Sequence, residues 1–416
     1  MLVGGLGGGG QAVFALDVTD PANFDEVNAA SLVLWEFDDS DDRDLGFTYG
    51  KPQITKMANG RWAAVFGNGY NNSAVDGMAS GTGRAVLFIV DLETGALISK
   101  LNTNTGSVAT PNGLATPAVI DYDGDYVADY IYAGDLQGNM WKFDVTDADP
   151  AQWGSDYTSG GNPQPLFTTS ASQPITTQPQ VTFHPDGLDG FMVYFGTGQY
   201  LEVDDNDPFA QPTQAFYGIW DKDESSLTVF DSTDLVTQTI NNQYQQAFDT
   251  DEDGVDDTSY WLRDMSDNDV DYAGDLGWKI NLQPTLVEGA ANANNFGERQ
   301  VSNAVVRDGR VIFTTLIPSQ QPCEFGGSSF VMQVNYQDGG ALNFPAFDLN
   351  GDGVFDETDT NASGRMSDVG IVPTLSILSD IDRDAAFGSG SSGDVDVLEL
   401  NIGSAATGRQ SWRQLD

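Results

Sequence analysis

The 416-residue sequence predicts an all-β fold. Helical periodicity is scarce, and short runs of β-branched and aromatic residues alternate with clusters of Gly, Asp, Asn and Pro. A longer repeat overlies this pattern, in which an apolar strand ends in aspartate or asparagine and a turn follows. We count about seven such units, at a spacing typical of the four-stranded blades of a β-propeller. The sequence therefore predicts a propeller of about seven blades, with a pair of β-sandwiches as the competing architecture.

Each unit is expected to contain up to three recognisable strands. Entry strands begin near a proline, at residues 51–54, 115–120, 178–181 and 372–375. Second strands, most of them ending in glycine, are expected at residues 62–67, 130–134, 192–196 and 310–314. Strands that end in Asp or Asn are expected at residues 14–17, 87–91, 141–144, 217–221, 278–281, 331–335 and 398–401. A single unit leaves an apolar face exposed, so stacking around a central axis is needed to bury both faces.

The whole chain, residues 1–416, is expected to form one propeller domain. The unit spacing is uneven, which indicates long acidic insertions on the rim, near residues 38–45, 202–213, 221–260 and 340–365. A Gly-rich turn at residues 4–10 leads directly into the first strand, with no secretory signal before it. We therefore expect the chain to be the C-terminal part of a longer protein.

The charge of the chain excludes several classes of partner. Lys and Arg total 17 against 62 Asp and Glu, a formal net charge of −45. This balance argues against nucleic acid and anionic membrane surfaces, and it favours cations. No stretch is apolar and long enough to span a bilayer. The lone cysteine, Cys323, cannot form an internal disulfide, and the single histidine, His184, lacks a second soft ligand for zinc.

Alternating acids at residues 121–129 predict a calcium site in a β-hairpin. The candidate ligands are the side chains of Asp121, Asp123, Asp125 and Asp129 and the main-chain carbonyl of Val127. They fill positions 1, 3, 5, 9 and 7 of a calcium loop, and calcium accepts about six to eight oxygen ligands in irregular geometry. The loop departs from a helix–loop–helix hand, since Tyr126 stands at position 6 in place of Gly and Tyr132 at position 12 in place of Glu. A solvated acidic turn is the plain alternative.

Two further loops have similar spacing. The second offers Asp249, Asp251, Asp253, Val255 and Asp257 as candidate ligands. The third offers Asp348, Asn350, Asp352, Val354, Asp356 and Asp359. Both have glycine at position 6, and the third comes closest to a complete hand loop. A solvated acidic connection remains the alternative for each, and it weighs more for the second loop.

Several sequence blocks resemble the C-terminal propeller of type IV pilus tip adhesins, the PilY family. They fall in order along the chain, at residues 3–7, 13–21, 66–70, 132–144, 195–201, 311–319, 322–327 and 408–415. The resemblance thus covers nearly the whole chain. Its most specific part is the Ala-Gly-Asp-Leu block at residues 133–136, beside the first acidic loop.

This resemblance implies a non-enzymatic, exported protein at the pilus tip or outer cell surface. It implies roles in pilus assembly, in balancing extension against retraction, in twitching motility and in adhesion, governed by calcium in the loop at residues 121–129. The implied partners are major and minor pilins and a host or abiotic surface. The family's N-terminal von Willebrand A-like region is missing here. No Arg-Gly-Asp tripeptide is present, so integrin binding is not implied.

Two other functions compete with this interpretation. The blade pattern also resembles quinoprotein propellers, with turns such as residues 91–95. Those quinone-dependent dehydrogenases typically carry a vicinal cysteine pair, which a chain with one cysteine cannot supply. A glycan-binding propeller is the other alternative, but the tryptophans lie within repeated strands, where blade packing is the simpler interpretation.

Overall fold

The computed structural model describes most of the chain. The described residues are 1–73, 77–169, 173–209, 211–224, 229–251, 253–288, 297–321, 325–379 and 383–403. Cys323, part of the block at residues 322–327 and the whole block at residues 408–415 lie outside them. Among the described residues, no helix has the length and apolarity needed to cross a membrane.

The first three large sheets come from the N-terminal half, and the third also takes in one strand from beyond it. The first contains β1 (Leu2–Gly5), β2 (Ala12–Leu16) and β3 (Val33–Asp38). The second contains β4 (Gln53–Lys56), β5 (Trp62–Gly67), β6 (Arg84–Asp91) and β7 (Leu97–Gly106). The third contains β8 (Ala118–Ile120), β9 (Tyr130–Gly134), β10 (Asn139–Asp144), β14 (Phe167–Thr168) and β18 (Phe230–Asp231), with β11 (Gly154–Ser155) beside β10.

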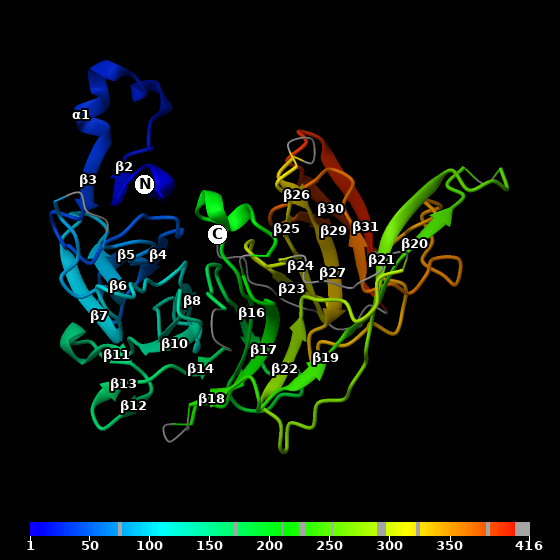
Figure 1. Cartoon of the computed structure of the whole chain (residues 1–416). Helices are drawn as coiled ribbons and strands as arrows, with labels where there is room; N and C mark the ends of the chain where they lie inside the picture. Colours follow the sequence, from blue (N-terminus) through cyan, green and yellow to red (C-terminus); the bar gives the residue numbers. More distant parts are fainter. Residues whose placement is uncertain are drawn as a thin grey trace.

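The other three large sheets occupy the centre and right of Figure 1, where β20 (Ile240–Phe248) and β21 (Thr258–Met265) of the fifth sheet lie farthest to the right. The fourth contains β15 (Gln180–Phe183), β16 (Phe191–Gly196), β17 (Ala215–Asp221), β22 (Gly277–Asn281) and β19 (Val236–Gln238). The fifth contains β23 (Val305–Arg307), β24 (Arg310–Thr314), β27 (Phe330–Asn335), β28 (Gly364–Met366), β21 and β20. The sixth contains β29 (Ser376–Ser379), β30 (Arg383–Ser389) and β31 (Val395–Asn401).

The remaining elements are small. Two-stranded ribbons are formed by β12 (Thr158–Ser159) with β13 (Asn162–Pro163), and by β25 (Ile317–Pro318) with β26 (Gly327–Ser328). The helical turns are η1 (Gly7–Gly9), η2 (Pro21–Asn23), η3 (Glu26–Asn28), α1 (Ala29–Leu32), η4 (Pro150–Gln152) and η5 (Val203–Asn206).

Buried apolar clusters lie between successive sheets. In the cluster between the first two sheets, Val13 of β2 packs with Phe66 of β5 and Phe88 of β6. Four more clusters join the second sheet to the third, the third to the fourth, the fourth to the fifth and the fifth to the sixth. Each inner sheet therefore buries both faces against its neighbours, which is how propeller blades are stabilised.

The all-β propeller prediction is confirmed, whereas the count of about seven blades is not. The seven strands predicted to end in Asp or Asn fall in six sheets, because β22 pairs with β17 in the same sheet. The predicted insertion at residues 221–260 is also more than a rim loop. It contains β18, β19, β20 and the start of β21, and the hairpin β20–β21 extends the fifth sheet at its edge (Figure 1).

Candidate calcium loops

The first acidic loop lies at the tip of the β8–β9 hairpin of the third sheet. Ile120 and Tyr130 are the last register pair before it, as the alternating pattern predicts. The hairpin is tied to the second sheet, since the N–H of Ala128 donates to the carbonyl of Lys56 at 2.9 Å. Ala128 is buried in the cluster between these sheets. The loop therefore starts and ends on a fixed support.

The main chain of this loop turns its acids inward. Asp121 accepts hydrogen bonds from the N–H groups of Gly124 at 2.7 Å and Tyr126 at 2.9 Å. Asp123 accepts from the N–H of Asp125, and Asp125 accepts from that of Val127. Carboxylate oxygens of Asp121, Asp123 and Asp129 lie within 4.8 Å of one another. The structure thus brings together three of the four predicted acids, while Asp125 is held close by within the loop.

Tyr126 keeps the backbone shape that glycine gives a hand loop. Its φ is 68°, in the left-handed region that non-glycine residues seldom adopt. The glycines at position 6 of the other two loops, Gly254 and Gly353, have φ of 87° and 76°. All three loops therefore make the same sharp turn at this position, and the absence of glycine in the first is not a departure in geometry.

Charge is concentrated at the end of the first loop. Asp129 accepts a hydrogen bond from the N–H of Tyr122 at 2.7 Å. Partial burial, reinforced by the charges of Asp123 and Asp121, raises the pKa of Asp129 above its ordinary value even against that hydrogen bond. A divalent cation would relieve this repulsion, and a set of carboxylate oxygens suits a hard ion such as calcium.

Sequence reasoning missed the aromatic surface beside this loop. Tyr122 and Tyr126 are each 51% exposed, and Phe183 of β15 is 64% exposed. The rings of Tyr122 and Phe183 are 6.1 Å apart, and Tyr122 also packs edge-on against Phe191 of β16. No local motif could have predicted this group, because its members come from two different sheets.

The second loop lies at the tip of the β20–β21 hairpin, after the register pair of Phe248 and Thr258. Its hydrogen bonds repeat the first pattern: Asp249 accepts from the N–H of Gly254 at 2.7 Å, and Asp253 accepts from that of Val255 at 2.8 Å. Carboxylate oxygens of Asp249, Asp251 and Asp253 lie within 4.8 Å of one another. Asp257 instead accepts from the N–H and hydroxyl of Thr250.

The third loop connects β27 to β28. Asp348 accepts from the N–H groups of Gly351 at 2.7 Å and Gly353 at 2.9 Å. Asn350 accepts from the N–H of Asp352, and Asp352 accepts from that of Val354. The last two candidate ligands, Asp356 and Asp359, have different hydrogen-bond partners. Asp356 accepts from the N–H and hydroxyl of Thr358, whereas Asp359 returns to the start of the loop.

Fold and loops together define a class of protein, a β-propeller that carries acidic, hand-like loops in the connections between its strands. A family model described as the PilY1 beta-propeller domain matches residues 1–259, more than half of the chain. The chain belongs to this PilY1 propeller family.

Individual relatives agree with this assignment. A "Type IV pilus biogenesis factor PilY1 homolog" of Xylella fastidiosa is 38% identical over 83% of this chain and 22% of its own length. "Type IV pilus biogenesis factor PilY1" of Pseudomonas aeruginosa is 31% identical over 100% of this chain and 36% of its own length. The crystal structure of the Pseudomonas aeruginosa PilY1 C-terminal domain matches 97% of this chain and 80% of that chain, with a TM-score of 0.77 and 30% identity.

The chain therefore spans 22% to 36% of the length of these curated relatives. Membership of the family favours the pilus interpretation over the quinone-dependent dehydrogenase and the glycan-binding propeller.

Proposed function

We propose that this chain is the non-catalytic propeller of an exported type IV pilus biogenesis factor, in which calcium at residues 121–129 regulates the pilus. The regulated processes are extension and retraction, twitching motility and surface adhesion, at the pilus tip or outer cell surface. The partners are major and minor pilins and a host or abiotic surface. The convergence of Asp121, Asp123 and Asp129 within a hand-like loop supports this proposal most directly.

The residues of the loop fit calcium. Asp121, Asp123, Asp125 and Asp129 would hold the ion with the carbonyl of Val127, and calcium would supply the charge that offsets their repulsion. Without the ion, like charges loosen the hairpin tip. With it, the tip is stabilised by mass action, and the neighbouring Tyr122 and Tyr126 are held in one arrangement. In this proposal, the ordered aromatic surface of the calcium-bound loop binds a pilin, and the loosened surface of the calcium-free loop does not. The second loop is proposed as an additional calcium site, because carboxylate oxygens of Asp249, Asp251 and Asp253 also lie within 4.8 Å of one another.

A calcium titration of chelated protein tests whether the first loop binds the ion. We expect calcium to raise the melting temperature, and Asp121→Asn to remove the part of that rise that belongs to this loop. Asp189→Asn is the matched control, because Asp189 is an exposed acid at the equivalent hairpin tip, between β15 and β16 of the next sheet. An equal calcium response in the two variants would contradict the site.

The same two variants test the pilus role in the bacterium that carries the gene. Surface pili and twitching zones should lose their dependence on calcium in Asp121→Asn cells and keep it in Asp189→Asn cells. If both strains respond to calcium like the parent, the loop does not regulate the pilus, even if it binds the ion.

A further inference from the structure

The third acidic loop, residues 348–359, shares two backbone features with the first loop. Its first acid, Asp348, is held by the N–H groups of Gly351 and Gly353. Its turn at position 6 is made by Gly353, with φ of 76°. These features match the first loop, but no three acids of residues 348–359, which the structure describes in full, have carboxylate oxygens within 4.8 Å of one another, as the acids of the other two loops do. Hydrogen bonds within an acidic turn also do not by themselves require an ion.

Asp359 supplies an independent observation. Its side chain is almost fully buried, since the residue is only 2% exposed. Its Oδ1 accepts from the N–H of Leu349 at 2.7 Å, which places the carboxylate over the start of the loop, near Asp348. Its Oδ2 is buried and has no hydrogen-bond partner among the described residues. A buried carboxylate oxygen without a partner is strongly unfavourable unless a cation or another donor reaches it.

Asp359 stands at position 12, where hand loops place their last acidic ligand. We propose that residues 348–359 bind a calcium ion of their own, through the side chains of Asp348, Asn350, Asp352 and Asp359 and the carbonyl of Val354. The carboxylates of Asp348, Asp352 and Asp359 together outweigh the charge of one divalent ion. An irregular set of protein oxygens favours calcium over magnesium, which demands near-ideal octahedral geometry.

Asp356 is not part of this site, although it fills position 9 of the sequence pattern. Its carboxylate accepts from the N–H of Thr358 at 2.8 Å and from the hydroxyl of Thr358 at 2.7 Å. It therefore caps the turn before Asp359 and faces the chain that follows. The same loop thus offers a ligand and a matched non-ligand of identical chemistry.

The loop also joins two sheets. The N–H of Asp348 donates to the carbonyl of Glu399 in β31 at 3.2 Å, and the guanidinium of Arg383 in β30 donates to the carbonyl of Gly353 at 2.8 Å. An ion held between Asp348 and Asp359 would fix the loop where it contacts the sixth sheet. This site is separate from the β8–β9 hairpin and does not depend on the proposed function.

Calcium stoichiometry tests the proposal in the full chain. The first loop is silenced with Asp121→Asn, and bound calcium is measured by equilibrium dialysis and elemental analysis. We expect Asp359→Asn in this background to bind about one calcium ion fewer per chain than Asp356→Asn. Because the second loop is intact in both variants, its contribution cancels. Equal binding by the two variants would overturn the proposal.

Thermal stability separates a ligand from a merely structural acid. In chelator, Asp359→Asn should melt at the same temperature as the background protein or higher, because it removes a buried charge without a counter-ion. In the presence of calcium, Asp359→Asn should instead melt at a lower temperature than the background protein. A loss of stability in chelator that calcium does not enlarge would assign Asp359 a structural role and contradict the site. Should Asp359→Asn fail to fold, Asp352→Asn, at an exposed ligand position, replaces it in both measurements with the same expected outcomes.

Discussion

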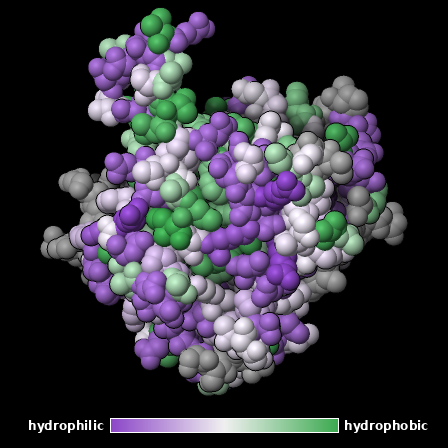
Figure 2. Space-filling view, turned by 90° about the vertical axis from the view of Figure 1, so that its left-hand side faces the viewer, coloured by the Kyte–Doolittle hydropathy of each residue, from purple (hydrophilic) through white to green (hydrophobic). Residues whose placement is uncertain are grey.

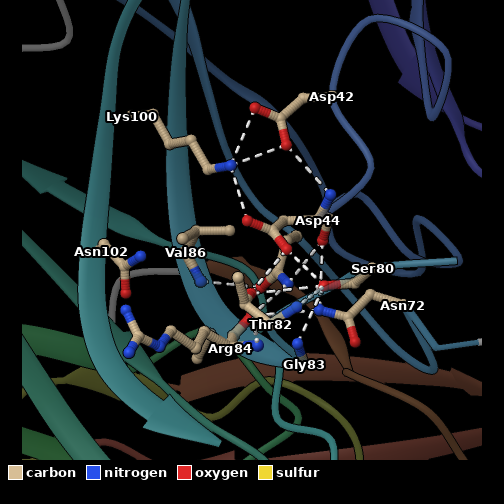
Figure 3. Close-up of polar contacts among 12 residues, drawn as sticks. Asp42, Asp44, Asn72, Ser80, Thr82, Gly83, Arg84, Val86, Lys100 and Asn102 are labelled. Atoms are coloured by element: carbon tan, nitrogen blue, oxygen red, sulfur yellow. Dashed lines mark hydrogen bonds and ion pairs between the residues drawn. The ribbon is translucent and has the colours of Figure 1, made fainter. Parts of the chain in front are cut away.

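Asp44 shows how one carboxylate is kept ionised inside this acidic chain. It lies in the predicted acidic insertion at residues 38–45 but is only 7% exposed. Figure 3 shows Lys100 reaching both Asp42 and Asp44, with Ser80 and Thr82 on the other side of Asp44. Burial alone would raise the pKa of Asp44, but the hydrogen bonds from Lys100, Ser80 and Thr82 lower it below its ordinary value.

We expect Asp44→Asn to lower the free energy of unfolding by about 1–3 kcal/mol at neutral pH, because buried donors lose a charged acceptor. The pKa of Asp44 is lower in the folded chain than in the unfolded chain. The stabilisation that the ionised Asp44 side chain provides is therefore complete above its pKa of about 3.9 in the unfolded chain. It is lost as the pH falls through the lower pKa of the folded chain. Urea unfolding from neutral pH to a pH of about 3 should show that the difference in free energy of unfolding between parent and variant becomes smaller. A difference that does not change with pH would show that charge is not the cause.

Between elements, a buried ionic cluster joins the third sheet to the fourth. Lys142 of β10 is fully buried, and its Nζ lies 3.2 Å from Asp221 of β17 and 3.0 Å from Asp156. Tyr132 and Tyr157 each donate a hydroxyl hydrogen bond of 2.5 Å to Asp221. Burial lowers the pKa of Lys142 by itself, but the charges of Asp221, Asp156 and Asp223 outweigh it and raise that pKa. The lysine therefore stays charged between the two sheets.

Replacing Lys142 with Met should cost about 3–5 kcal/mol of unfolding free energy, because Asp221 would keep a buried charge without its cation. Arg61→Met is the control, since Arg61 pairs with Asp91 while its side chain is 63% exposed. Asp91 is itself largely buried, but solvent at the exposed guanidinium screens the attraction, so this pair should be worth only about 1 kcal/mol. Denaturant unfolding of both variants measures the difference. Similar losses would mean that the cluster between the sheets is no stronger than an ion pair with a solvent-exposed cation.

The elements that the sequence predicts correctly are those with a local signature. The strands at residues 62–67 and 130–134 coincide with β5 and β9, because apolar runs between turn residues determine them. The sharp turns of the three acidic loops are likewise local features of the spacing of acids, whereas calcium binding by these loops stays a prediction. The pairing of β22 with β17 is not local, since more than fifty residues separate the strands, and it removes one unit from the predicted blade count.

Side-chain roles were harder to predict than positions. Asp356 and Asp359 are equally acidic candidates in the sequence, and only the fold shows that Asp356 caps a turn while Asp359 is buried over the loop. The cluster around Lys142 draws its acids from two separate segments of the chain, Asp156 and the pair Asp221 and Asp223, so no motif could predict it.

At the scale of the whole molecule, repulsion among acids opposes the stacking of sheets. The formal net charge is −45. Figure 2 shows hydrophilic residues over much of the face that includes the first sheets, with apolar patches among them. Folding brings these surface acids closer together than they lie in the unfolded chain, so the net charge destabilises the compact state.

Monovalent salt should therefore stabilise the protein even without calcium. The screening length falls from about 10 Å at 0.1 M salt to about 3 Å at 1 M, which weakens repulsion between exposed carboxylates more than attraction within buried pairs such as Lys142 and Asp221. In chelator, we expect the melting temperature to rise by several degrees over this range of sodium chloride. Choline chloride should have nearly the same effect, because screening depends on ionic strength and not on a site for sodium. A rise with sodium alone would place the effect in the acidic loops, and no rise with either salt would show that surface repulsion does not limit stability.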